Sequence, residues 1–389
     1  MKKHIASLAA LFACVLLTAE TLADSVDAVV PEPFVGFDND SKFAINYDDL
    51  TDLLTIVVAD VGLSKREIAK IPEARTGTRM TPKIQRLTTY EANRVAYEAF
   101  KDNEEAKSLL REIQTSLQKI PDEMPLDQFS RDEQLAYWLN LYNVTVLNEI
   151  VAIYPKRNLK RLLHGKKSIL DKKLLNVSGI SLSLNDIQHN ILRKNYNNDP
   201  RIMYGLYQGI VGGPNIRKSA YTGDDVYYAL EDNAYEFINS NRGTFSRSDD
   251  DFMRVSSFYD RNKAFFPQFD NQLSQHLLEY LRDGAQRTRL QIVDRIEPNI
   301  NDWTVTDMGG TRHEISGSFA DNHAALLDSY QGPRRIDGGR MVASIEVKRP
   351  KKEKEKDEDE EDAVALENLG VIPIGEGAAP EDITTGDVD

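Results

Sequence analysis

The sequence predicts an α+β fold, in which a single, predominantly helical domain carries a small sheet. Two observations lead to this prediction. Between about residues 47 and 281, apolar residues recur at helical spacing in segments that begin at capping residues and end at breakers. The segments 201–208, 290–293 and 303–305 are short and have the composition of strands, so we expect strands there.

The N-terminus has the features of a bacterial signal peptide. Lys2 and Lys3 precede the apolar stretch 5–17, and small residues occupy Thr21 and Ala23, the positions that signal peptidase reads. We therefore expect cleavage after residue 23 and a mature protein that is periplasmic or secreted. The apolar stretch is shorter than the about 20 residues of a membrane-spanning helix, and no later segment approaches that length, so no transmembrane span is expected after cleavage.

Two alternatives for the N-terminus are an uncleaved anchor and lipidation at Cys14. The residues before Cys14 resemble a lipobox only loosely, because Phe12 is bulky and the apolar run continues past the cysteine. Cys14 is the only cysteine, so cleavage would leave no thiol in the mature protein. This excludes disulfides, thiolate metal sites and a cysteine nucleophile. No motif in the sequence indicates a cofactor, so none is expected.

Charge and composition divide the rest of the chain. We expect a linker at 24–40, the main domain at 41–285 and a small appended segment, partly strand, at 286–345. Most of the net charge of −14 falls in 346–389, where fifteen acidic and six basic residues stand. This segment is predicted to be a disordered acidic tail, because its few apolar residues cannot offset the entropy of ordering. Nothing in the chain resembles a phosphate-binding footprint, so nucleic-acid binding is not expected.

The first elements of the main domain are helical. A helix is predicted from about Tyr47, where leucines follow at close to helical spacing. The polar stretch 72–85 contains glycine and prolines and is predicted to be a loop. A long amphipathic helix is then predicted from Ala92 to Lys119, ending before Pro121.

The clearest helix begins at Ser130. Ser130 and Glu133 form a capping box, in which each side chain can accept from the other residue's backbone N–H. Pro155 ends this helix. One face carries the apolar residues Leu135, Trp138, Leu139, Tyr142 and Val146. We therefore expect Trp138 in the core.

Capping residues predict further helices. Ser183 with Asp186 begins one, Thr222 with Asp225 begins another that runs to about residue 238, and a last helix is predicted over 271–281. The glycine-rich stretch 209–214 lies between them. It is either a tight turn or a place where backbone approaches a ligand.

His189 is the first candidate for chemistry. On a helix it would share a face with Asp186 and follow Gln188, so either residue could orient the imidazole. The alternative is a structural histidine. Asn140 and Asn143 likewise either hydrogen-bond to neighbouring loops or line a pocket.

One pair of residues resembles part of a metal motif. His313-Glu314 matches half of a zinc-binding helix, but no second histidine follows at the required spacing. No metal site is therefore expected.

Taken together, several of these segments resemble one family. The segments concerned are 133–143, which contains Ala136-Tyr137-Trp138-Leu139-Asn140-Leu141-Tyr142-Asn143, then 183–193, 199–217, 220–222, 237–239 and 255–259. In this order they are similar to the motifs of the domain of unknown function 547 family, and the likeness covers roughly residues 45–285.

The departures from the family pattern bear on function. Met203 stands where the family has histidine, Gln208 and Gly213 stand where it has cysteines, and Gln188 replaces a glutamate. The family's Cys, His and Glu pattern is similar to that of papain- or transglutaminase-like thiol hydrolases, which implies a fold of that kind. A thiol mechanism needs an activated thiolate. This chain therefore resembles a relative that has lost its catalyst.

We accordingly expect a non-catalytic binding or scaffold protein, whose partner is a small ligand or an unknown protein of the cell envelope. Its binding residues are expected around one cleft, and they are Met203, Tyr207, Gln208, Gly212, Gly213, Asn140 and Asn143. The rival function is a hydrolase or transferase that uses His189 with Asp186 or Gln188. A buried His189 with satisfied ring nitrogens favours the first function, and an open cleft beside Gln208 and Tyr207 favours the second.

Overall fold

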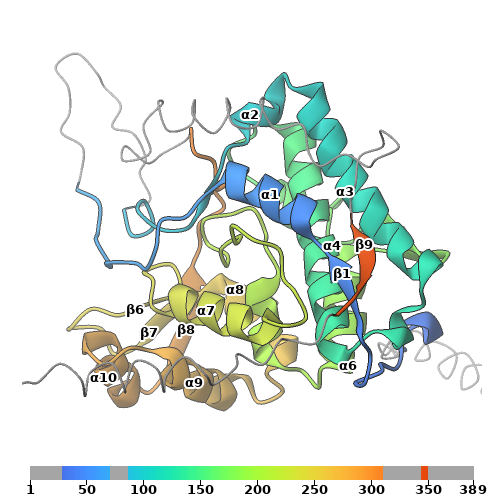
Figure 1. Ribbon diagram of the computed structural model, residues 1–389. Coiled ribbons are helices and arrows are strands. Elements are labelled where there is room, and N and C mark those ends of the chain that lie inside the picture. Colours follow the sequence, from blue (N-terminus) through green and yellow to red (C-terminus); the bar gives the residue numbers. More distant parts are fainter. Residues whose placement is uncertain (1–28, 71–85, 310–342, 349–389) are drawn as a thin grey trace, which may run out of the picture. The chain divides into compact units, whose positions relative to one another are not determined.

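The computed structural model describes residues 29–70, 86–309 and 343–348, and all of them fall in one compact unit, Met1–Lys348. The predicted signal peptide, the predicted loop at 72–85, the pair His313-Glu314 and nearly all of the predicted tail lie outside these residues. The prediction of a predominantly helical α+β domain with small sheets is confirmed (Figure 1).

Helices make up most of the described chain. In order they are α1 (Asp48–Val57), α2 (Glu98–Lys101), α3 (Glu104–Glu123), α4 (Arg131–Ile153), α5 (Lys160–His164), α6 (Arg193–Asn195), α7 (Val226–Ile238), α8 (Ser257–Arg261), α9 (Phe269–Tyr280) and α10 (Ala285–Ile292). Short 3-10 helices include η1 (Glu32–Phe34) and η4 (Pro200–Gly205), and a π-helix, η3, spans Asp186–Leu192.

The strands are short and form separate small sheets. They are β1 (Phe43–Asn46), β2 (Val58–Ala59), β3 (Arg94–Val95), β4 (Leu175–Val177), β5 (Ile180–Leu182), β6 (Thr244–Phe245), β7 (Met253–Ser256), β8 (Ile296–Ile300) and β9 (Ser344–Val347). β1 pairs antiparallel with β9, β2 with β3 and β4 with β5. β7 lies between β6, which is antiparallel to it, and β8, which is parallel.

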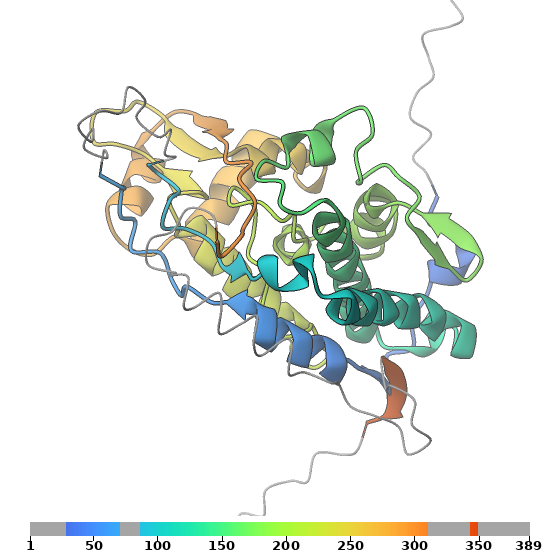
Figure 2. The ribbon, with the colours of Figure 1, turned by 90° about the horizontal axis from the view of Figure 1, so that it is seen from above.

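α4 is the centre of the core. Its side chains from Glu133 to Tyr142 are all buried, so the helix is covered on every side rather than on the one predicted face. α3 packs along it, as Figures 1 and 2 both show. Trp138 is fully buried, as predicted. Its ring meets those of Phe34 and Tyr137 edge-on, with centroids 5.0 Å apart in each pair.

The capping box at the start of α4 is only half formed. Ser130 Oγ accepts from the Glu133 N–H at 3.3 Å, as predicted. The Glu133 carboxylate instead accepts from the backbone N–H of Ile45, at 3.1 Å, and is nearly unexposed. A buried carboxylate needs a donor, and β1 supplies one that is remote in sequence. Glu133 therefore ties β1 to α4.

Three predicted elements are wrong. The helix predicted over 92–119 is shifted, because Ala92 has a φ of 70° and the helix begins only at Glu104, where Asn103 caps it. Pro121 lies inside the last turn of α3 rather than beyond the helix end, although proline has no N–H to donate to the carbonyl four residues back. The predicted strand 201–208 begins as the 3-10 helix η4, and residues 290–293 lie in α10 and at its end.

The segment 296–308 is part of the main core. β8 pairs with β7, and the Gly209 carbonyl accepts from the Thr306 N–H at 3.0 Å. Gly209 has a φ of +73°, and a Cβ there would lie 2.1 Å from the Ile150 side chain. At Gly212, a Cβ would meet the backbone of Asp302 at 2.8 Å. The glycines thus allow a tight turn packed against the Ile150 side chain and the Asp302 backbone, which confirms the structural interpretation of this stretch.

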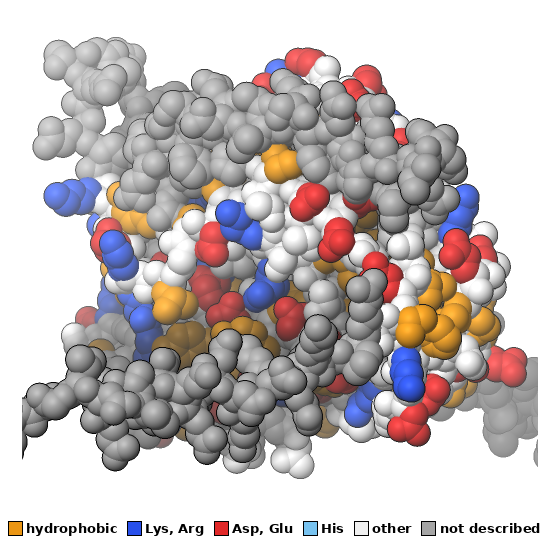
Figure 3. Space-filling view, in the orientation of Figure 1, with side chains coloured by type: hydrophobic (Ala, Val, Ile, Leu, Met, Phe, Trp, Pro, Cys, Tyr) orange, Lys and Arg blue, Asp and Glu red, His pale blue; other side chains and the backbone are white. Residues whose placement is uncertain are grey.

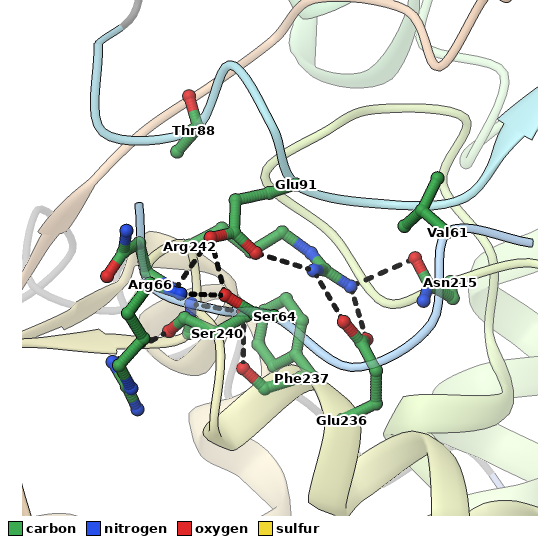
Figure 4. Close-up of polar contacts among 12 residues, drawn as sticks. Val61, Ser64, Arg66, Thr88, Glu91, Asn215, Glu236, Phe237, Ser240 and Arg242 are labelled. Carbon is green, nitrogen blue, oxygen red and sulfur yellow. Dashed lines mark hydrogen bonds and ion pairs between the residues drawn. The ribbon is translucent and has the colours of Figure 1, made fainter. Parts of the chain in front are cut away.

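A buried polar network joins α7 to the loop before β3. Arg242 has no exposed side-chain surface and donates to the Glu236 carboxylate at 2.9 and 2.5 Å (Figure 4). It also donates to Asn215 Oδ1 at 2.9 Å and lies 3.6 Å from Glu91. Burial raises the pKa of Glu236, and Arg242 offsets part of that rise. The network holds segments distant in sequence together.

The surface of the described chain carries mixed charge. On the face shown in Figure 3, acidic and basic side chains are interspersed rather than gathered by sign. None of the helices within the described ranges combines the length and apolar character needed to cross a bilayer. The first residues of the tail predicted from residue 346 are ordered, because Glu346 and Val347 lie in β9 and pair with β1.

Candidate functional site

A cavity of about 360 Å³ opens between α5, η3 and α8. Its size falls in the range of ligand pockets, about 300–1,000 Å³. Polar side chains dominate its lining, which consists of Leu163, His164, Gly165, Ser168, Leu170, Asp171, Asn185, Gln188, His189, Gln208, Arg261 and Asn262. Three of the predicted site residues, Gln188, His189 and Gln208, therefore meet in one cavity.

The π-helix η3 places two of these residues side by side. Ser183 and Asp186 cap it as predicted, since Asp186 Oδ2 accepts from Ser183 N–H at 2.7 Å and Ser183 Oγ accepts from Asp186 N–H at 3.1 Å. The Arg193 N–H then donates to the Gln188 carbonyl, five residues back. π-helical turns are rare in proteins, and many of those that occur lie at functional sites. Here the turn directs Gln188 and His189 into the same cavity.

The predicted pairing of Asp186 with His189 is not formed. Asp186 accepts hydrogen bonds from Lys173, from Ser183 and, at 3.2 Å, from Asn190. These donors occupy the carboxylate because it caps the helix, and no hydrogen bond joins it to the His189 ring among the described residues. Burial, with a smaller contribution from Arg193, lowers the pKa of His189, which keeps its ring neutral near pH 7.

Gln188 and Gln208 are each held by a partner within the cavity wall. Gln188 Nε2 donates to Asn262 Oδ1, and Asn262 Nδ2 donates to the Phe258 carbonyl at 2.8 Å. Gln208 Oε1 accepts from Arg261 Nη2 at 3.2 Å. Both glutamines are buried. The two amides therefore have fixed orientations.

Ser168 has the one hydroxyl side chain among the lining residues that the structure describes. Its Oγ donates to the Leu163 carbonyl and accepts from the Leu170 N–H at 3.0 Å. This serine closes a turn after α5. Its hydroxyl is committed to backbone groups, and no hydrogen bond joins it to a histidine or carboxylate in the described part of the chain.

Several lining residues were not predicted from the sequence, and Arg261, Asn262 and His164 matter most among them. Arg261 ends α8 and Asn262 follows it, just beyond a stretch that resembles the family, and His164 ends α5. Trp303 backs this wall, with the Arg261 Cζ 4.7 Å from its ring centroid and the His164 ring at 4.9 Å. Only the tertiary fold brings these segments together, so no local pattern could have identified them.

The other predicted binding residues do not line the cavity. Met203 is fully buried, and the Tyr207 hydroxyl lies 2.9 Å from the Tyr97 hydroxyl in the core. Gly212 packs against the backbone of Asp302. Gly213 lies behind Gln208, since a Cβ built on it would be 3.6 Å from the Gln208 Cβ.

Asn140 and Asn143 make the loop hydrogen bonds that were one of their two predicted uses. Asn140 accepts from Tyr221 N–H at 2.9 Å and donates to its carbonyl at 2.8 Å. Asn143 donates to the Gly205 carbonyl and accepts from Tyr207 N–H, both at 2.9 Å. Both side chains therefore fix the loops that follow η4.

Within the described ranges, no group of three or more His, Cys, Asp or Glu residues could hold a metal ion. No significant match was found among curated proteins or among solved structures. A family model, described as "Protein of unknown function, DUF547", matches residues 126–238. The match includes α4, η3 and Gln208, so this segment of the chain is similar to the DUF547 family.

Proposed function

We propose that this protein is an exported, non-catalytic binding protein, periplasmic or secreted, whose ligand site is the cavity around His189 and Gln208. One observation carries the proposal. Gln188, His189 and Gln208, which stand where the resemblance places Glu, His and Cys, line one cavity although they come from two separate segments. The convergence supports a site inherited from a thiol enzyme. The ligand is a small molecule or a group on a cell-envelope protein.

The side chains around His189 support binding without turnover. Acyl transfer needs a nucleophile within hydrogen-bond reach of a base, and the base in turn is held by a third group. Gln208 is an amide, Ser168 is bonded to backbone, and Asp186 is bonded to donors other than His189. His189 thus has no nucleophile to activate among the lining side chains.

The second candidate function is a hydrolase or transferase in which His189 activates a water molecule. The observation that favours it is the position of His189, which is partly exposed and lines an open cavity beside Gln208. For an enzyme, we expected His189 in an open cleft beside both Gln208 and Tyr207. Only Gln208 lies there, because Tyr207 is buried in the core. A neutral imidazole can act as a general base. Without Asp186, its orientation would depend on the cavity wall.

Restoring the thiol tests the inheritance of the site. In Gln208→Cys, we expect a thiol pKa at least one unit below the ordinary value of about 8.5, because the Arg261 guanidinium that now contacts Gln208 would stabilise the thiolate. The mature protein would have this thiol alone, so its ionisation can be followed by the pH dependence of alkylation.

Two control variants sharpen this test. Ser181→Cys places a thiol on exposed β5 and gives the reference pKa. Adding Arg261→Gln to Gln208→Cys should return the pKa towards that reference or above it. A Gln208→Cys thiol that titrates at or above the Ser181→Cys thiol would argue against an inherited thiol site.

A further inference from the structure

Arg261 is a partly buried cation that has no acidic partner among the described residues. Its Nη1 donates to Ser257 Oγ at 2.6 Å and its Nη2 donates to Gln208 Oε1 at 3.2 Å. Its Nε is buried and has no acceptor, and no carboxylate lies within 4.0 Å of the guanidinium in the part of the chain that the structure describes. Burial lowers the pKa of Arg261 to about 10, and Asp260 offsets this only in part. An unpaired guanidinium beside a cavity favours an anion in that cavity.

Trp303 fixes this cation at the cavity wall. The Arg261 Cζ lies 4.7 Å from the Trp303 ring centroid, and Lys160 Nζ lies 5.9 Å from the same ring. Cation–π contact of this kind restrains the guanidinium, while Nη1 and Nη2 each carry a second N–H besides the one donated to Ser257 or Gln208. Arg261 is therefore pre-organised.

The charges around the cavity indicate whether the anion carries one negative charge or two. Besides burial, Arg261 and Lys160 lower the pKa of His164, and Arg193 lowers the pKa of His189, so cations dominate the field in the cavity. Both imidazoles are then neutral near pH 7. Asp171, an exposed residue of the lining, hydrogen-bonds to Asn185 at 2.7 Å and would repel a second negative charge.

We infer that the cavity binds the carboxylate of a small polar ligand, with Arg261 as the residue that pairs with it and Gln208 and His189 as neighbouring contacts. This inference rests on the proposed function, because it takes the cavity to be a binding site. Arginine binds carboxylates through paired N–H donors. Arg261 is the one Lys or Arg side chain among the described lining residues, and one cation matches a monoanion better than a phosphate dianion.

The chain's two tryptophans provide a direct test. Trp303 packs on Arg261, whereas Trp138 is in the core, so the two indole N–H signals in NMR report the site and the fold separately. We expect titration of the mature protein with propionate to shift the Trp303 signal with saturation and to leave the Trp138 signal in place. Propionamide, which has the same shape without the charge, should bind roughly tenfold or more weakly.

Variants assign the effect to one residue. Arg261→Gln should weaken propionate binding by roughly tenfold or more, and Arg261→Lys should weaken it less. Arg254→Gln removes a cation from β7, outside the cavity, and should change nothing. An unchanged Trp138 signal shows that each variant is folded.

The results that would contradict the carboxylate assignment differ from the results that would contradict the proposed function. Equal binding of propionamide, or tighter binding of inorganic phosphate, would overturn the carboxylate assignment and leave a binding site in place. Saturable binding that survives Arg261→Gln, or no saturable shift with propionate, would overturn it as well. None of these results bears on turnover, which tests the proposed function independently.

Discussion

Replacing Arg242 by methionine should lower the free energy of unfolding by about 3–5 kcal/mol. The guanidinium has no exposed surface and lies against the carboxylates of Glu236 and Glu91. Methionine fills much of the volume but leaves both carboxylates buried without their cation. The cost is therefore that of an unpaired buried charge, which is larger than the net gain from the ion pair itself. Denaturant unfolding of the mature protein measures it.

Two control variants separate this charge effect from side-chain loss. Arg254→Met removes an arginine from β7 whose Nε donates to an exposed partner, Asn299, and should cost less than about 1 kcal/mol. Glu236→Leu combined with Arg242→Met should recover part of the loss, because both members of the closest pair are then apolar. A loss below about 1 kcal/mol for Arg242→Met alone would mean that the network does not hold the fold.

Trp138→Ala should cost about 3–5 kcal/mol of unfolding free energy. The ring is fully buried against Phe34 and Tyr137, so its removal leaves a cavity that rigid neighbours on α4 cannot fill. Phe34 also belongs to the segment predicted to be a linker, and that segment should loosen when its contact is lost.

The matched control is Trp303→Ala, at the partly exposed ring beside the cavity, which should cost clearly less. The same denaturant experiment measures both. Equal losses for the two tryptophans, or unchanged stability for Trp138→Ala, would contradict a core role for Trp138.

Local signals predicted the helices well where they were unambiguous. Ser130 begins α4 and Pro155 follows its end, as capping and proline chemistry require. The strand predicted over 201–208 failed because a local signal was overlooked. Asp199 accepts from the Arg201 N–H, and Pro200 occupies the first helical position, which together begin η4.

The site was only partly predictable, for a physical reason. Gln188 and His189 follow the capping pair Ser183 and Asp186, so a local pattern located them. The same pattern explains why Asp186 is unavailable to His189. Arg261 reaches the cavity through contacts with Trp303, which is distant in sequence, and no spacing in the chain encodes that meeting.

The central claim is that this cavity binds a ligand without turning it over. Product formation by the mature protein on a panel of ester, amide and thioester substrates tests it most directly, with a cysteine-containing DUF547 relative measured alongside. We expect the wild-type protein and His189→Ala to give the same rate as buffer, because no lining side chain supplies an activated nucleophile. Turnover by the wild-type protein that His189→Ala abolishes would contradict the claim and establish the water-activating enzyme instead.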